Sequence, residues 1–158
     1  MVWTVGGVSR MLPPPVERRR RDTPGRVRWE RAGTRNALVT GAGRGIGAAI
    51  ARRLAADGFR VWLHHHRSRE AAEALQKEIE AAGGAALLVR FDLASPEAIE
   101  RELGPLLERE GPLEVLVNNA ALTRDGLVPR MSDEDWDTVI ATDLSGPFRV
   151  TRAALRGM

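Results

Sequence analysis

Short apolar runs alternate with longer segments of helical period from residue 36 to the end of the chain. This alternation is typical of strands joined by helices, and therefore of a parallel sheet. The pattern predicts four strand–helix pairs. In the first predicted helix, Ile46, Ile50 and Leu54 recur every fourth position, a helical spacing. The predicted strands cover 37–39, 60–63, 85–91 and 113–117.

Residues favoured at helix ends fit the same scheme, because serine is common before a helix, proline in its first turn and glycine after its end. They are Gly58 after the first helix, Ser68 and Gly83 around the second (70–82), Ser95 and Pro96 at the third, and Ser132 with Asp135 at the last, which continues to the end of the chain. The pattern predicts an α/β fold: a Rossmann-type, doubly wound parallel sheet, truncated after about four βα units.

The chain has 158 residues and is 43% hydrophobic, which is enough for one core, and we expect residues 36–158 to form one domain. No apolar run approaches the ~20 residues of a membrane helix, and no secretory signal precedes the domain. The chain has no cysteine, so disulfides, thiolate catalysis and thiolate metal sites are excluded. These features predict a cytoplasmic protein without a membrane partner.

Positive charge is concentrated at the N-terminus. Residues 1–35 contain nine arginines and three acidic residues, a net +6, whereas the rest carries 15 basic and 18 acidic residues, a net −3. This segment lacks a periodic apolar pattern, so we interpret it as a disordered tail: a solvated extension, or the product of a start codon placed too far upstream. Binding to nucleic acid or a membrane surface through phosphates is a less favoured alternative, as is an Arg-rich transit peptide.

A glycine-rich turn, residues 40–47 (TGAGRGIG), joins the first predicted strand to the first predicted helix. Glycines let the backbone approach a ligand closely, and the free N–H groups at a helix start attract an anion. We therefore predict a dinucleotide site that holds a diphosphate; a turn whose glycines serve only steric needs is the alternative. No Lys-Ser or Lys-Thr follows, which excludes a P-loop. The predicted cofactor-binding residues of the turn are Gly41, Gly43, Arg44, Gly45, Ile46 and Gly47.

The glycine spacing, Thr-Gly-x-x-x-Gly-x-Gly, resembles that of the short-chain dehydrogenases/reductases. Two further segments resemble this family in order and spacing: Asp92-Leu93, and the run Val117-Asn118-Asn119-Ala120-Ala121 after the fourth strand. The resemblance covers residues 36–158. It implies that Asp92 and Leu93 contact the adenine and that Asn119, Ala120 and Ala121 shape the cofactor pocket.

Basic residues follow the second predicted strand, where an NAD-selective site places a carboxylate. They are His64, His65, His66 and Arg67, with Arg44 in the turn as a second cation. We therefore predict NADP(H), with His66 and Arg67 near the 2′-phosphate; a solvated Arg67 is the alternative. No metal site is expected, because neighbouring histidines on a strand point to opposite faces.

Reduction of a ketone requires a proton donor for the developing alkoxide. The resemblance implies a tyrosine in this role, with a lysine and a serine nearby. The chain has no tyrosine, its single lysine, Lys77, is expected on the surface, and the family positions would lie beyond Met158, so we expect this chain alone to be inactive. The resemblance also assigns Asp143 to a catalytic position, where the family has an asparagine that anchors a proton-relay water. A carboxylate accepts hydrogen bonds, whereas an amide also donates.

Within the family, segments 122–127 and 130–137 are most similar to 3-oxoacyl-(acyl-carrier-protein) reductases. This resemblance implies NADPH-dependent reduction of a 3-oxoacyl thioester by a homodimer or homotetramer. An inactive dinucleotide-binding fragment and a dehydrogenase acting on another carbonyl or alcohol are the alternatives. Arg149, Arg152 and Arg156 are predicted to form a basic stripe on the last helix, either a docking face for an acidic acyl carrier protein or a solvated surface.

Overall fold

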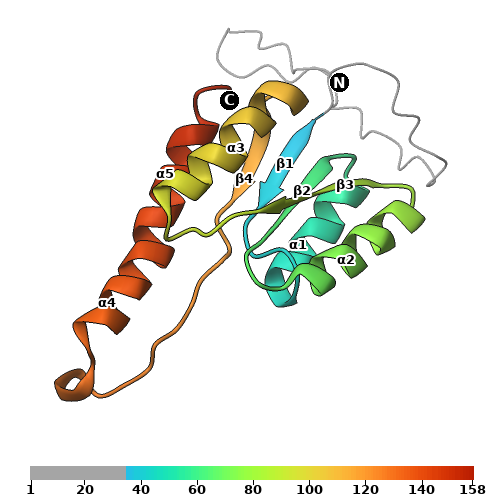
Figure 1. Ribbon diagram of the computed structural model, residues 1–158. Coiled ribbons are helices and arrows are strands. Elements are labelled where there is room, and N and C mark those ends of the chain that lie inside the picture. The colour runs from blue at the N-terminus through green and yellow to red at the C-terminus, as the bar shows by residue number, and fades with distance from the viewer. Residues whose placement is uncertain (1–34) are drawn as a thin grey trace, which may run out of the picture.

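The computed structural model describes residues 35–158, so all of the predicted tail (residues 1–35) except residue 35 lies outside the described part. Strands and helices alternate along the chain (Figure 1). The strands are β1 (Asn36–Val39), β2 (Arg60–His65), β3 (Ala85–Arg90) and β4 (Leu113–Val117). The α-helices are α1 (Gly45–Ala56), α2 (Arg69–Ala81), α3 (Pro96–Glu110), α4 (Asp133–Val139) and α5 (Gly146–Ala154). A 3₁₀ turn, η1 (Val128–Arg130), precedes α4, and a π-helical segment, η2 (Ile140–Ser145), joins α4 to α5.

The four strands form one parallel sheet in the order β3-β2-β1-β4. The chain first moves outward from β1 to β3 and then returns to place β4 on the other side of β1. This reversal at β1 creates a crevice at the carboxyl ends of the strands, which is where open α/β sheets bind ligands. The predicted Rossmann-type α/β fold is therefore confirmed.

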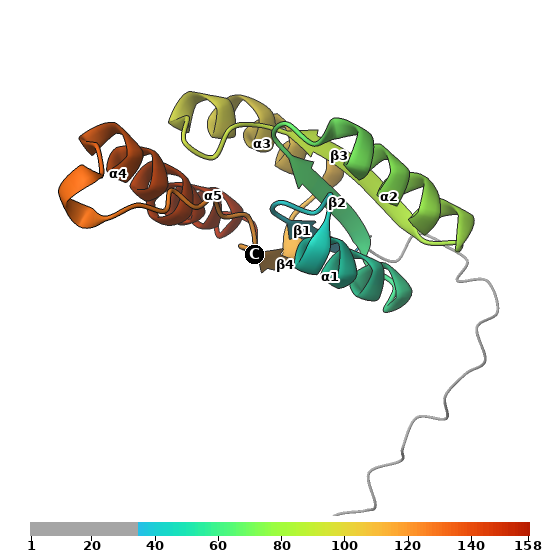
Figure 2. The ribbon, with the colours of Figure 1, turned by 90° about the horizontal axis from the view of Figure 1, so that it is seen from below.

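Helices cover both faces of the sheet, α1 and α2 on one side and α3 and α5 on the other (Figure 2). Successive strand residues point to opposite faces, so each strand contributes to two cores. Leu38 and Trp62 pack with α3 and α5, whereas Val39 and Leu63 pack with α1 and α2. All four residues are fully buried.

Arg35, which the charge pattern grouped with the tail, is bonded to the domain. Its guanidinium pairs with Glu114 at 2.9 Å and lies 3.9 Å above the centre of the Phe59 ring. Its carbonyl accepts a hydrogen bond from the backbone N–H of Arg60. The folded domain therefore includes residue 35.

Several predicted helix ends are confirmed by their hydrogen bonds. The side chain of Ser95 accepts from the N–H of Ala98, and Pro96 occupies the first turn of α3. Ser132 accepts from the N–H of Asp135 in the same way. Ser68 precedes α2 but makes no capping bond through its side chain. Strand β2 is two residues longer than predicted, because His64 and His65 pair with β3.

The apolar spacing in α1 identified the helix and part of its buried face. Ile46 is 74% exposed, and the fully buried positions of the helix are small residues such as Ala48 and Ala51. Small side chains let the helix lie close to the sheet. Ile50 and Leu54 are partly buried against the same core, so only Ile46 departs from the predicted apolar face.

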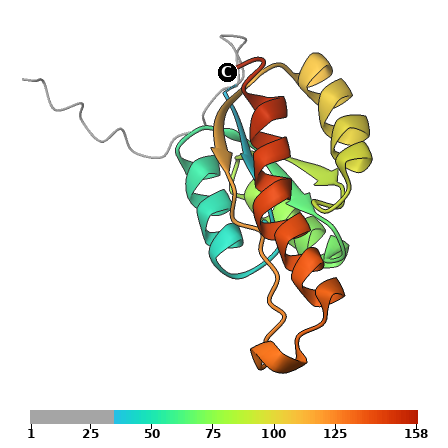
Figure 3. The same ribbon diagram turned by 90° about the vertical axis from the view of Figure 1, so that its left-hand side faces the viewer.

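The last predicted helix is present and is helical from residue 133 to residue 154, but it includes a π-helical segment that the sequence did not predict. Residues 133–154 form a rod in which η2 separates α4 from α5 (Figure 3). Pro147, in the first turn of α5, has no N–H to donate to the carbonyl of Asp143. The missing i to i−4 bond explains why the helix widens at this point. No helix within residues 35–158 is long and apolar enough to cross a membrane.

Candidate dinucleotide site

The glycine turn lies at the carboxyl end of β1 and leads directly into α1 (Figure 1). Strands β2 and β4 flank β1, so the turn is bordered by the carboxyl ends of both neighbours. Gly41 adopts φ +64, and a Cβ built on it would lie 2.9 Å from the Cα of Ala120. The left-handed conformation and the contact with β4 both require glycine at this position.

Side chains from two strands tie the turn to β4. The Thr40 hydroxyl oxygen accepts from the N–H groups of Asn119 at 2.9 Å and Ala120 at 3.0 Å, and its proton is directed at the carbonyl of Val117. The amide nitrogen of Asn119 donates to the carbonyls of Thr40 at 2.8 Å and Gly41 at 3.3 Å. Thr40 was not among the predicted site residues, although it opens the motif. Its hydroxyl connects the two segments that the family resemblance had identified separately.

The first N–H groups of α1 remain available for a ligand. Within residues 35–158, the backbone N–H groups of Gly45, Ile46 and Gly47 have no hydrogen-bond partner, and Ala48 is the first residue of the helix to bond back, to Arg44. Arg44, at the N-cap position, is exposed, as is the side chain of Ile46 beside these N–H groups. Together with the helix dipole, this arrangement can bind an anion such as a diphosphate.

The predicted cations lie on two loops that meet beside the turn. A Cβ on Gly43 would lie 3.1 Å from the hydroxyl of Ser68, so the loop after β2 contacts the glycine turn. Arg44 and Arg67 are both exposed on these loops, and neither makes an ion pair with any other residue that the structure describes. They are therefore free to meet a phosphate.

The predicted adenine residues lie at the end of β3. Asp92 accepts from the N–H of Ala94 at 3.0 Å, and its carboxylate lies 3.8 Å from the ring of His66. Leu93 is 4% exposed, and its carbonyl lies close to Gly146 of α5. The structure thus places Asp92 and His66 together beside the crevice, whereas the side chain of Leu93 belongs to the core.

The three histidines differ in their surroundings. His64 and His65 are buried, at 2% and 4% exposure, whereas His66 is half-buried. Burial lowers the pKa of His64 to about 4. Burial also lowers the pKa of His65, and the nearby Arg90 acts in the same direction. Across residues 35–158, no group of three or more His, Asp or Glu side chains is arranged to hold a metal ion.

Asp143 lies in η2, beside the segment that follows β4. Its carboxylate accepts from the backbone N–H of Leu122 at 3.0 Å. An asparagine could accept the same bond through its oxygen and would also present an N–H₂ donor. On the same segment, the side chain of Asn118 donates to the hydroxyl of Thr151 at 3.1 Å, which ties β4 to α5. Ala121 lies between these contacts and is exposed.

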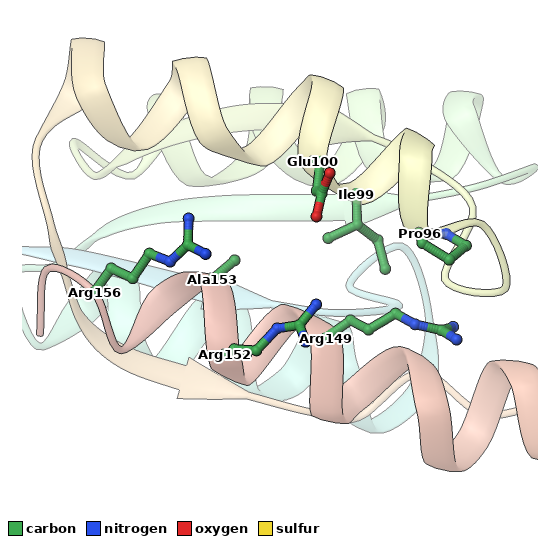
Figure 4. Close-up of a pocket in the computed structure, with 7 residues that line it drawn as sticks. All are labelled: Pro96, Ile99, Glu100, Arg149, Arg152, Ala153 and Arg156. Carbon is green, nitrogen blue, oxygen red and sulfur yellow. The ribbon is translucent and has the colours of Figure 1, made fainter.

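The predicted arginine stripe is only partly helical, because Arg156 lies beyond the end of α5 at Ala154. Arg149, Arg152 and Arg156 line a small cavity between α3 and α5, with Glu100 opposite (Figure 4). None of the three forms an ion pair with another described residue, whereas the guanidinium of Arg152 lies over the ring of Phe148. The stripe therefore faces α3 as much as it faces outward.

Comparisons with known proteins agree with this fold. A family model described as short chain dehydrogenase matches residues 35–158. The chain belongs to the short-chain dehydrogenase family, and the expected resemblance is confirmed. It is 41% identical over 121 residues to a 3-oxoacyl-[acyl-carrier-protein] reductase FabG of Staphylococcus aureus, covering 77% of this chain and 49% of the relative. It is 43% identical over 122 residues to the enzyme of that name from Escherichia coli, covering 77% and 48%.

Solved structures show the same likeness. A short-chain dehydrogenase from Burkholderia cenocepacia in complex with NADP has a TM-score of 0.74 at 39% identity, covering 80% of this chain and 51% of that one. A metagenomic short-chain oxidoreductase in complex with NADP has a TM-score of 0.75 at 41% identity, covering 78% and 56%. The chain spans about half the length of the curated relatives it matches.

Proposed function

We propose that residues 35–158 form the NADP(H)-binding part of an oxidoreductase, and that the whole protein reduces 3-oxoacyl thioesters. One observation carries the cofactor assignment: the open row of N–H groups at the start of α1, at the carboxyl ends of four parallel strands. Family membership supports the reaction class. The names of the similar reductases support the substrate class.

The residues present fit a nicotinamide dinucleotide. The N–H groups of Gly45, Ile46 and Gly47 would donate to its diphosphate, and Arg44 and Arg67 would pair with a 2′-phosphate. His66 and Asp92 border the expected position of the adenosine, and Asn119, Ala120 and Ala121 lie along the inner wall of the crevice. When bound, the cofactor supplies the hydride. The chain's part is to hold and orient it, because the turn is fixed by Thr40 and Asn119.

Calorimetric titration with NADPH and NADH tests the cofactor. We expect NADPH to bind at least about tenfold more tightly, because one charge-assisted hydrogen bond contributes about 1.5 to 3 kcal/mol. Arg44→Ala and Arg67→Ala should reduce this preference. Arg53→Ala is a matched control, since its side chain pairs with Asp57 at the far end of α1. Tighter binding of NADH would overturn the NADP assignment, and binding of neither would overturn the site.

An inactive dinucleotide-binding protein is the second candidate, and Asp143 favours it. The carboxylate accepts from Leu122 and has no proton to donate to a relay when it is ionised. Reduction of a 3-oxoacyl thioester by the complete protein would distinguish the candidates. A third candidate, a dehydrogenase for another substrate, would reduce a different carbonyl with NADPH or oxidise an alcohol with NADP+, and would leave the thioester unchanged. Three further properties stay predictions: assembly as a homodimer or homotetramer, use of a carrier-bound substrate, and a cytoplasmic location.

A further inference from the structure

The side chain of His64, on β2, contacts two neighbouring segments through its ring nitrogens. One nitrogen bonds to the glycine turn, and the other bonds to the residue that follows β3. The residue lies near the carboxyl end of β2 and is 2% exposed. The backbone N–H of Gly41 donates to Nδ1 at 3.2 Å. Nε2 lies 3.0 Å from the carbonyl oxygen of Phe91, and the two rings are 4.0 Å apart between centres.

These partners fix the protonation of the ring. A backbone N–H can only donate, so Nδ1 has to be free of a proton, and a carbonyl can only accept, so Nε2 has to carry one. The neutral ring with its proton on Nε2 is the single form that satisfies both bonds. A charged ring would direct an N–H of His64 at the N–H of Gly41. The pKa of about 4, lowered by burial, agrees with a neutral ring.

The backbone of His64 adds a third bond to the same turn. Its carbonyl accepts from the N–H of Ala42 at 2.9 Å. His64 thus occupies the N–H groups of Gly41 and Ala42 from the β2 side, while Asn119 occupies the carbonyls of Thr40 and Gly41 from the β4 side. Gly41 is held at both its N–H and its carbonyl by side chains from neighbouring strands.

The position of Gly41 affects the start of α1. A Cβ on Gly47 would lie only 2.4 Å from the carbonyl oxygen of Gly41, so the two glycines are in direct backbone contact. A shift of Gly41 would therefore move the first turn of α1. The free N–H groups of Gly45, Ile46 and Gly47 would move with it.

We propose that His64 is a positioning residue of the dinucleotide site: its neutral Nε2–H form holds Gly41 in place and thereby sets the direction of the N–H groups that bind the diphosphate. This inference rests on the proposed function. It assigns a role of its own to a histidine that the sequence analysis grouped only with the basic residues after the second predicted strand. The charged and titratable groups around His64 are His65 and His66 on its own segment and Asp92 after β3.

Two amide variants separate the two ring nitrogens. In His64→Asn the side-chain oxygen can occupy the position of Nδ1 and accept from Gly41, but the side chain is too short to reach Phe91. In His64→Gln the terminal amide can reach the carbonyl of Phe91, but nothing accepts from Gly41. We expect the Kd for NADPH to stay within about threefold of the parent in His64→Asn and to rise about tenfold or more in His64→Gln. His65→Gln is the matched control, a buried histidine on the opposite face of β2, and should leave the Kd unchanged.

Two measurements without a cofactor complete the test. Long-range ¹H–¹⁵N spectra of the parent protein should show the His64 proton on Nε2 near neutral pH. Hydrogen exchange at the N–H of Gly41 should stay slow in His64→Asn and become fast in His64→Gln. A proton on Nδ1, or equal Kd values in His64→Gln and the parent, would overturn the inference and leave the proposed function intact. A parent protein that binds no dinucleotide would overturn both.

Discussion

At the scale of single residues, the glycines of the turn differ in what they tolerate. Gly45 has φ +55 and would carry a Cβ in open space. Gly47 is surrounded: a Cβ there would lie 2.4 Å from the Gly41 oxygen and 2.5 Å from the Asn119 side-chain nitrogen. Backbone strain limits the first position and packing limits the second. Gly45 and Gly47 are therefore required for different physical reasons, although they belong to the same motif.

Alanine substitution should reveal this difference. Gly45→Ala should cost about 1 to 2 kcal/mol of folding free energy, the cost of a left-handed alanine, because nothing crowds it. Gly47→Ala should cost more and should also abolish dinucleotide binding, since the carbonyl of Gly41 has to move. Urea unfolding and NADPH titration of both variants would check this. Equal losses in the two variants would show that the contact at Gly47 is unimportant.

Stability should also depend on pH through His64. The unfolded chain protonates this histidine near its ordinary pKa of 6.5, whereas burial lowers the folded pKa to about 4. The neutral ring therefore stabilises the folded chain fully above pH 6.5, and this contribution is lost as the pH falls from 6.5 towards 4. The parent should lose up to about 3 kcal/mol more than His64→Asn over this range. Denaturant unfolding at several pH values measures the difference, and parallel curves would contradict it.

At the scale of helices and strands, the sequence predicted features that depend on neighbouring residues, such as helix caps. It did not predict contacts between elements that are distant in the chain. The caps at Ser95 and Ser132 depend on residues three positions away, so sequence alone locates them. The exposure of Ile46 depends on how closely α1 approaches the sheet. The bonds of His64 join residues 23 and 27 positions apart, and no spacing rule indicates them. The sequence thus predicted the glycine turn at the start of α1, but not the side chains that hold this turn in place.

Asp143 lies in the π-helical segment η2, and the wider turn there sets the position of its side chain. Pro147 widens the helix there, and the carboxylate reaches the N–H of Leu122. In the complete protein, Asp143→Asn should keep this bond and add a donor, so kcat should rise severalfold with little change in KM if the relay operates. Steady-state kinetics with a 3-oxoacyl thioester would show it. Asp143→Ala is the control, because it removes both functions, and an unchanged kcat in Asp143→Asn would exclude the relay.

At the scale of the whole molecule, different pairs of helices cover the two faces of the sheet. Helices α1 and α2 cover the face that continues from the glycine turn, and α3 and α5 cover the other. The rod from α4 to α5 carries exposed apolar residues, Trp136, Leu144 and Phe148, beside its arginines. The alternation predicted the strands and helices, but not which apolar side chains of the rod stay exposed, because their exposure depends on how α4 and α5 pack against the rest of the domain.

Substitution of the arginines on this rod tests whether an acyl carrier protein docks there. In the complete protein, replacing Arg152 and Arg156 with glutamate should raise KM for a carrier-bound substrate about tenfold and spare a small thioester analogue. The two residues make no ion pair with other described residues, so folding should be little affected. Replacing Arg101 and Arg109 on α3 with glutamate is a control of equal charge change. Equal losses on both substrates would refute the carrier contact.

The bond between Thr40 and Asn119 spans 79 positions of the chain. A ribosome therefore releases every glycine of the turn long before the strand that closes it. Until residue 119 has emerged and β4 has docked, the nascent chain carries the motif without the pocket. We therefore expect the dinucleotide to bind during synthesis only after that point. Its binding would follow the folding of the domain and would not direct it.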